Sequence, residues 1–483
     1  MRSIVTIPSY PFQRRRYWIE EREPAPPVVE APRLVQPLRE VASIENSGRV
    51  ERGAPVPDAA KEASETNDPL WQSLVATGEA QMAAGFEGSS IDQETAKLAV
   101  LNQLSEGFLR RACKQLGLDT AATTEGNAGL ENSAVAPRYR KAVAGWLRPP
   151  DSSINGSSQN PTQLWPSVAE LWKSELFLPQ LVRQCGQQLT EVLRGEVDPL
   201  TIIFDKGSSA VMERIYSQST WARFCNGLIQ SIIRARLQGG GESEQLSLLE
   251  IGAGTGATTR AILPLLPAER TTYTFTDLGP NFLQSARDKF ADYPFVQYEL
   301  LDIESNPAGQ AFAKAKFDIV IAANVLHATR DLEQTLRHVR RLLKPGGLLL
   351  LWEATSQQRW MDISFSPLEG WQRFEDFALR PQQPLLAPDQ WLELIRSLGF
   401  AAAHVFPEPG LPSAALGQSV ILARAAIEEA ATSVETERSR PIDPAPASTQ
   451  CRPSLFYQVE WIKLDRGSKG AVPRSRGPGR WRI

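Results

Sequence analysis

Histidine and cysteine are scarce in this chain of 483 residues, which contains three histidines and four cysteines. The cysteines are widely separated, and none belongs to a Cys-x-x-Cys pair. This spacing argues against a disulfide framework and against a structural zinc site, so we expect no bound metal. The histidines, His327, His338 and His404, all follow residue 326, so any histidine-based chemistry belongs to the last part of the chain.

Long apolar runs and an excess of one charge are also missing. The run Leu348–Trp352 is far shorter than the ~20 residues that a membrane-crossing helix needs, and the N-terminus lacks the apolar segment of a signal peptide. The 52 Lys+Arg nearly balance the 55 Asp+Glu, which gives no electrostatic basis for binding nucleic acid. We therefore expect a soluble, cytoplasmic protein with neither membrane nor nucleic acid among its partners.

Apolar periodicity divides most of the chain into two regions. Within residues 70–240, apolar side chains recur every three or four positions, which predicts a mostly helical region. Within residues 241–426, short apolar runs alternate with helical patterns, which predicts a parallel sheet in an α/β domain, with Ser419–Arg424 as a late edge strand. Residues 21–69 and 427–452 are rich in Pro and Ala without periodicity, and we interpret them as linkers.

The most specific motif is a glycine-rich turn that directly follows the first apolar run and precedes a helical pattern. It reads Glu250-Ile-Gly252-Ala-Gly254-Thr-Gly256, a GxGxG spacing instead of the GxGxxG of a phosphate-binding dinucleotide loop. Glycine allows a tight turn and a close approach of the backbone to a ligand. The acidic Glu250 favours a cationic ligand without a phosphate group.

Polar residues also end the next three strands of the predicted sheet: Asp277 the second, Asp302 the third and Asn324 the fourth. Ligands of such sheets bind at the carboxyl ends of the strands. We therefore expect these side chains to line one site with the glycine turn. A carboxylate at Asp277 can bind both hydroxyls of a ribose.

In combination these signals resemble a class I S-adenosylmethionine-dependent methyltransferase: the glycine turn, Asp277, LLDIE, AANVLHAT and LLKPGGLLLL, over about residues 246–425. The stretches NVLHATRDLEQTLRHVRRLLKPGG and SPLEGWQRFEDFALRPQQPLL are similar to the methyltransferase domains of modular polyketide synthases, and ERIYSQSTWARFCNGLI to their helical lid subdomain. The resemblance implies a Rossmann-like sheet with an N-terminal lid. It also implies that S-adenosylmethionine is bound by Glu250, Gly252, Gly254, Gly256, Asp277, Asp302 and Asn324.

The two flanks carry resemblances of their own. Residues 1–20, with TIPSYPFQRRRYWIE, are similar to the C-terminal tail of an acyltransferase domain, and residues 453–465, with SLFYQVEWIKL, to the start of a ketoreductase region. Residues 466–483 contain six basic and no acidic side chains among Gly, Pro and Ser, which is typical of a disordered tail. We expect a fragment of a larger synthase, or a short protein that uses a carrier supplied in trans.

A candidate base follows the fourth predicted strand. His327 comes after that strand by a short loop, and Glu353 ends the fifth strand, which lies beside the fourth in this fold. A carboxylate next to an imidazole orients the ring and raises its basicity, and the resemblance implies that the two act as a catalytic His–Glu pair. His338, among arginines in a helical pattern, is expected to be solvated, and His404 to be structural.

The resemblance also implies the methyl acceptor and the partners. The acceptor would be an acyl group on the phosphopantetheine arm of an acyl carrier protein, in contact with other synthase domains. The first 326 residues lack the histidine that a dehydratase needs, so a β-keto or β-hydroxy group would be retained. We predict methylation of the α-carbon of a β-ketoacyl thioester, since two carbonyls make that carbon acidic. O-methylation of the β-hydroxyl, a free small-molecule methyltransferase and an inactive structural fragment stay open.

Overall fold

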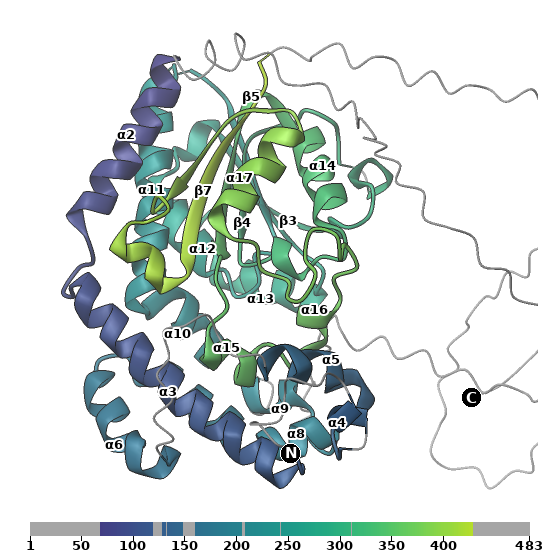
Figure 1. Cartoon of the computed structure of the whole chain (residues 1–483). Coiled ribbons are helices and arrows are strands. Elements are labelled where there is room, and N and C mark those ends of the chain that lie inside the picture. The colour runs from purple at the N-terminus through teal and green to yellow at the C-terminus, as the bar shows by residue number, and fades with distance from the viewer. Residues whose placement is uncertain are drawn as a thin grey trace, which may run out of the picture. The chain divides into compact units, whose positions relative to one another are not determined.

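Figure 1 shows the computed structural model of the protein, which describes residues 68–118, 128–131, 133–147, 160–204, 208–241, 243–310 and 312–427. The expected acyltransferase tail, ketoreductase start and basic tail lie outside these residues, as does nearly all of both expected linkers. Within the described part, no helix combines the length and the apolar character that crossing a membrane requires.

Helices occupy the described residues that precede the sheet, as the apolar periodicity predicts. They are α2 (Pro69–Ala84), α3 (Ile91–Gln115), α4 (Ala128–Glu131), α5 (Pro137–Trp146), α6 (Pro161–Leu171), α7 (Phe177–Gln187), α8 (Leu189–Arg194), α9 (Pro199–Ile203), α10 (Ala210–Gln218) and α11 (Thr220–Gly239). Polar residues start several of them; Ser90 and Gln93 form a reciprocal capping box at the start of α3. We call this region, residues 69–239, the lid.

Within the described residues, seven strands form one sheet, which with its helices makes the core, residues 246–425. They are β1 (Leu246–Ile251), β2 (Thr271–Asp277), β3 (Val296–Leu300), β4 (Phe317–Ala323), β5 (Leu343–Ala354), β6 (Phe400–Phe406) and β7 (Gln418–Ala425). The order is β3-β2-β1-β4-β5-β7-β6, and only β7 runs antiparallel to its neighbours. The predicted α/β fold is confirmed.

The position of the last strand differs from the expectation. Ser419–Arg424 belongs to β7, which pairs with β5 on one side and β6 on the other, so it is not an edge strand. All residues of β7 are buried. Burial of every residue is typical of an internal strand that is covered on both faces. The position of a strand within the sheet, however, depends on contacts between segments far apart in the chain.

The remaining elements connect the strands. The helices are α12 (Ala257–Ile262), α13 (Pro280–Lys289), α14 (Leu332–Leu342), α15 (Arg359–Ser364), α16 (Glu369–Gln372) and α17 (Pro388–Ser397). The 3-10 turns are η2 (Leu263–Leu265), η3 (Ala268–Arg270), η4 (Pro307–Gln310), η5 (Leu326–Ala328) and η6 (Pro412–Leu416). The turn η5 is the short loop that carries His327 beyond the end of β4.

His338 is buried, which corrects the expectation that it is solvated. It is 5% exposed, and its Nδ1 is 2.8 Å from the carbonyl oxygen of Ile303. Thr335, His338 and Leu342 are spaced by three and four residues, so they share the face of α14 that packs on the sheet. The arginines beside His338 in sequence lie on other faces of the helix.

The lid and one face of the sheet share a single apolar core. Along β5, Leu350 and Trp352 point to the face that the lid covers, while Leu349 and Leu351 point to the face of α14 and α17. The helices α2 and α11 run side by side next to the sheet (Figure 1). The sequence pattern changes near residue 246, but the lid and the sheet on either side of that point pack together in one apolar core.

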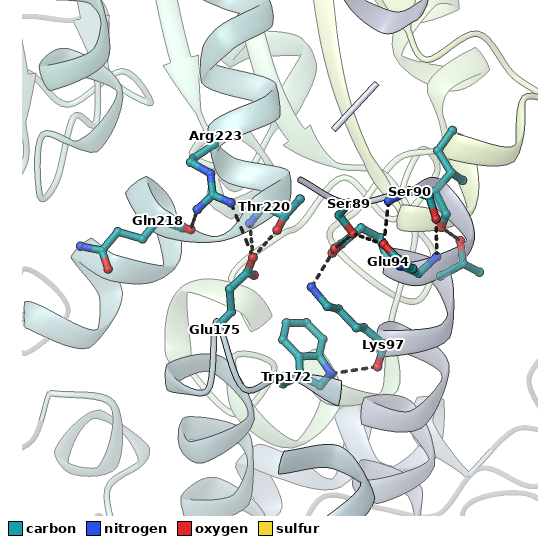
Figure 2. Close-up of polar contacts among 12 residues, drawn as sticks. Ser89, Ser90, Glu94, Lys97, Trp172, Glu175, Gln218, Thr220 and Arg223 are labelled. Carbon is teal, nitrogen blue, oxygen red and sulfur yellow. Dashed lines mark hydrogen bonds and ion pairs between the residues drawn. The ribbon is translucent and has the colours of Figure 1, made fainter. Parts of the chain in front are cut away.

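Buried polar contacts hold the lid helices together, as Figure 2 shows. Glu175 is 3% exposed and accepts hydrogen bonds from the backbone N–H and the hydroxyl of Thr220, at the start of α11. On α3, Lys97 forms a buried ion pair with Glu94 at 2.8 Å, and the Trp172 indole donates to the Lys97 carbonyl at 3.1 Å. The Glu175 contacts fix the start of α11, and the Trp172 contact ties the end of α6 to α3.

Candidate active site

A cavity of 310 Å³ lies at the carboxyl ends of the strands, between the core and the lid. Of the residues predicted from the sequence, those that line it are Glu250, Gly252, Gly254, Asp277, Asp302, Asn324 and His327. Gly256 and Glu353 do not line it. Residues of the lid and of the segment after β5 form the rest of the wall.

The glycine turn leaves β1 with a backbone that favours glycine. Gly252, Gly254 and Gly256 have φ values of +59°, +54° and +73°. A Cβ at Gly256 would lie 2.7 Å from the Phe290 ring, so this glycine allows close packing inside the core. A Cβ at Gly254 would meet only the Gly252 oxygen, at 3.8 Å, so free space borders the turn there.

Asp277 joins the end of β2 to the glycine turn. Its Oδ2 accepts from the Gly254 N–H at 2.9 Å, and its Oδ1 accepts from the Gly279 N–H at 2.7 Å. Burial raises the pKa of this carboxyl, although the backbone N–H groups act in the opposite direction. The carboxylate therefore holds the turn in place from the cavity wall.

Glu250 lies deeper, at the end of β1, and is 1% exposed. Its Oε2 accepts from the Tyr273 hydroxyl at 2.6 Å and from the Thr259 hydroxyl. Burial raises its pKa to about 7, which the two hydroxyls partly oppose. A group with this pKa changes charge in the neutral range, and a cation in the cavity would favour the ionised form.

Asp302 and Asn324 follow the ends of β3 and β4 and line the same cavity. The carboxylate of Asp302 accepts from the Glu304 N–H at 3.1 Å and the Ser305 hydroxyl at 2.9 Å. Asn324 has φ +53°, and its Oδ1 accepts from the Ala354 N–H at 3.1 Å. Its buried Nδ2 finds no hydrogen-bond partner among the described residues. Such a donor is one that a ligand oxygen or nitrogen would satisfy.

His327 and Glu353 form a buried pair at the cavity, with His327 on its lining and Glu353 behind the imidazole. The His327 Nδ1 is 2.6 Å from the Glu353 Oε2, and Glu353 is fully buried. The other oxygen, Oε1, accepts from the N–H groups of Val325 and Leu326, at 3.2 and 2.8 Å. The carboxylate thus anchors both the imidazole and the loop that carries it.

Aromatic side chains also line the cavity. The sequence suggested Trp371 for an acceptor pocket and Tyr216 for the lid over the cofactor, but neither as a catalytic residue. It did not single out Trp221 or Trp352. Trp371 lies with its ring centre 5.2 Å from that of His327, edge to face. From the lid, Tyr216 and Trp221 contact Trp352 of β5, with ring centres 6.3 and 5.5 Å from its own. Burial raises the pKa of Tyr216 to about 12, so its hydroxyl keeps its proton. Trp371 lies in SPLEGWQRF, part of a stretch that resembles the methyltransferase domains of polyketide synthases, and that resemblance is the sequence feature that points to it.

One group of described residues places three possible metal ligands within 4.8 Å of one another: Glu79, His404 and Glu408. None of them lines the cavity. Burial lowers the pKa of His404, against the effect of the two carboxylates. The group lies between α2 and β6, apart from the residues described above.

The sheet order, the glycine turn and the strand-end side chains define a class I S-adenosylmethionine-dependent methyltransferase. A family model described as "Methyltransferase domain" matches residues 249–349. Among solved structures, the CurJ carbon methyltransferase is 33% identical with a TM-score of 0.62, over 76% of this chain and 99% of that one. The DszA carbon methyltransferase is 25% identical with a TM-score of 0.58, over 78% and 96%.

Relatives in sequence indicate the kind of protein in which such methyltransferase domains occur. Polyketide synthase ThaG of Burkholderia thailandensis is 33% identical over 346 residues, which cover 68% of this chain and 6% of that protein. Non-reducing polyketide synthase mapC of Penicillium roqueforti is 37% identical over 226 residues, 46% of this chain and 9% of that one. The chain belongs to the methyltransferase domains of polyketide synthases. It matches less than a tenth of the length of these two relatives.

Proposed function

We propose that this domain transfers a methyl group to the α-carbon of a β-ketoacyl thioester carried by an acyl carrier protein. The observation that carries the proposal is the buried His327–Glu353 pair, whose imidazole lines the same cavity as the glycine turn. The other domains of a polyketide synthase, including the carrier, are the partners that the relatives suggest.

The polar wall of the cavity, formed by Glu250, the glycine turn, Asp277, Asp302 and Asn324, fits S-adenosylmethionine. When bound, this group supplies an electrophilic methyl group on a sulfonium. Free space beside Gly254 admits a ligand next to the backbone. Asp277 stands where a carboxylate can accept from ribose hydroxyls, and the unpartnered Nδ2 of Asn324 offers a donor. Glu250 supplies negative charge beneath the turn for the amino group or the sulfonium, and Asp302 extends the polar wall.

His327 would act as the general base. With Nδ1 donating to the carboxylate of Glu353 across the 2.6 Å contact, Nε2 would be the proton acceptor. The α-carbon loses its proton to Nε2, and the carboxylate of Glu353 stabilises the imidazolium that forms. A positioned base of this kind contributes typically ~10²–10⁴-fold to the rate. The backbone N–H groups of Val325 and Leu326, which donate to Glu353, hold its carboxylate against the loop that carries His327.

The aromatic wall favours an apolar acyl chain as acceptor. Trp371, Trp352 and Tyr216 border the cavity on the side of His327 and keep water away from the reacting carbon. The two solved relatives that are named carbon methyltransferases support carbon rather than oxygen as the acceptor. O-methylation of a β-hydroxyl would use the same base, so the two products must be separated by experiment.

The test offers the full chain S-adenosylmethionine with carrier-bound β-ketoacyl and β-hydroxyacyl thioesters, and mass spectrometry locates the added methyl group. We expect methylation of the α-carbon of the keto substrate. Methylation of the hydroxyl alone would reassign the domain as an O-methyltransferase. Failure to bind S-adenosylmethionine in isothermal titration calorimetry would support an inactive structural segment. His404→Ala is the matched control for His327→Ala, because His404 does not line the cavity.

A further inference from the structure

Arg380 is a fully buried cation in the segment between α16 and α17. Its side chain is 0% exposed, and it belongs to the stretch FEDFALRPQQPLL, which contributes no residue to the proposed base or to the glycine turn. A buried charge is costly unless it is paired and hydrogen-bonded. The contacts of Arg380 therefore indicate what its burial supports.

The guanidinium of Arg380 is bonded through all three of its nitrogens. Its Nε donates to the Asp376 carboxylate at 2.7 Å. Its two terminal nitrogens donate to four backbone carbonyls, those of His327 at 2.8 Å, Thr329 at 2.8 Å, Arg330 at 3.2 Å and Pro384 at 3.3 Å. Three of these carbonyls belong to the loop that follows β4.

The partner of Arg380 holds the far end of the same loop. The second carboxylate oxygen of Asp376 accepts from the Leu332 N–H at 3.0 Å, where α14 begins. In addition, the Glu375 N–H donates to the Arg330 carbonyl at 2.8 Å. The loop from residue 325 to residue 332 is thus held from two directions: Glu353 binds its first N–H groups and the imidazole, and the Arg380 segment binds its carbonyls.

We infer that Arg380 is a positioning residue for the base: its guanidinium fixes the backbone on which His327 stands, and with it the direction of Nε2. This inference rests on the proposed function. Arg380 does not line the cavity, so it acts through the loop that carries His327. The planar guanidinium of an arginine has five N–H donors and can bind carbonyls on several sides at once. A lysine has its three donors on a single nitrogen and cannot reach the same set of carbonyls.

Kinetics of Arg380→Lys and Arg380→Met in the full chain provide the first test. We expect kcat with the carrier-bound β-ketoacyl substrate to fall by about 100-fold, with the KM for S-adenosylmethionine unchanged. The control is Arg424→Met, since Arg424 is another buried arginine, 8% exposed, which binds Asp68 and does not line the cavity. An unchanged kcat in the Arg380 variants, or an equal loss in Arg424→Met, would overturn the inference.

Histidine NMR provides a readout that needs no turnover. The chain has only three histidines, so labelled His327 can be assigned from His327→Ala and His404→Ala spectra. We expect the downfield signal of the His327 Nδ1 proton, bonded to Glu353, to shift or broaden in Arg380→Lys and stay in place in Arg424→Met. A His327 signal identical to wild type in Arg380→Lys would refute positioning. A wild type that fails to methylate the keto substrate would refute the proposed function instead, and the ring signal would still report on Arg380.

Discussion

The two walls of the cavity differ in origin and in chemistry. The wall formed by the glycine turn and Asp277 comes from the ends of parallel strands, and its polar groups are bonded to the backbone of the core. The wall next to His327 is aromatic and comes from the lid, from β5 and from the segment after β5, with Tyr216 and Trp371 as examples. Strand ends therefore provide a rigid polar surface, whereas the apolar surface is assembled from segments far apart in the chain.

This difference implies that binding of the methyl donor and transfer to the acceptor can be separated by substitution. Residues of the polar wall should change the affinity for S-adenosylmethionine. His327 and the residues that orient it should change turnover at unchanged affinity. Comparing the affinity for S-adenosylmethionine with the turnover in each variant tests whether the two change independently.

The largest effect is expected from His327→Ala. Turnover of the keto substrate should fall by ~10²–10⁴-fold because no group remains to take the proton. The Kd for S-adenosylmethionine should be unchanged, since the imidazole serves the acceptor. Mass spectrometry measures the first quantity and titration calorimetry the second. Normal turnover by this variant would contradict the base assignment.

Asp277→Ala should have the opposite profile. It removes an acceptor for the ribose and also frees the Gly254 and Gly279 N–H groups. Hydrogen bonds to a charged group contribute ~1.5–3 kcal/mol each, so we expect the Kd for S-adenosylmethionine to rise by about 100-fold. Asp318→Ala is the control, because Asp318 pairs with Lys344 and does not line the cavity. Wild-type affinity would remove Asp277 from the donor site.

Glu250→Gln should change how stability depends on pH. The folded protein raises the pKa of this carboxyl from 4.5 to about 7, so between these values the folded state holds a proton that the unfolded state has lost. The free energy of unfolding should therefore fall as pH rises through this window, by about 2 kcal/mol. Denaturant titrations at pH 5 and pH 7 should show a smaller difference in Glu250→Gln. An equal difference in both proteins would contradict this account.

Glu353→Gln should give the smallest of these effects. Glutamine keeps an oxygen for the Val325 and Leu326 N–H groups but loses the charge that stabilises the imidazolium. We expect kcat to fall by about tenfold with unchanged affinity for S-adenosylmethionine, a milder loss than in His327→Ala. Steady-state kinetics of the two variants side by side provide the comparison. A larger loss than in His327→Ala would move the base role toward the carboxylate.

Local patterns in the chain were enough to predict much of the polar wall. Alternating strands and helices, the GxGxG spacing and the polar residues Asp277 and Asn324 at strand ends are short-range signals, and parallel strands bring their carboxyl ends to one edge. His327 and Glu353 were predicted as a pair for the same reason, because β4 and β5 are neighbours. These residues needed only the sheet order, which the family pattern implies.

The rest depended on contacts between distant segments. β7 is internal because β6 pairs with its outer side, and His338 is buried because its helix face packs on the sheet. The lid shares its apolar core with the sheet, although the sequence pattern changes between them. Arg380 reaches the His327 loop across more than fifty residues of chain. Burial and hydrogen-bond partners of this kind arise only when segments meet in space, because no local propensity of the chain encodes them.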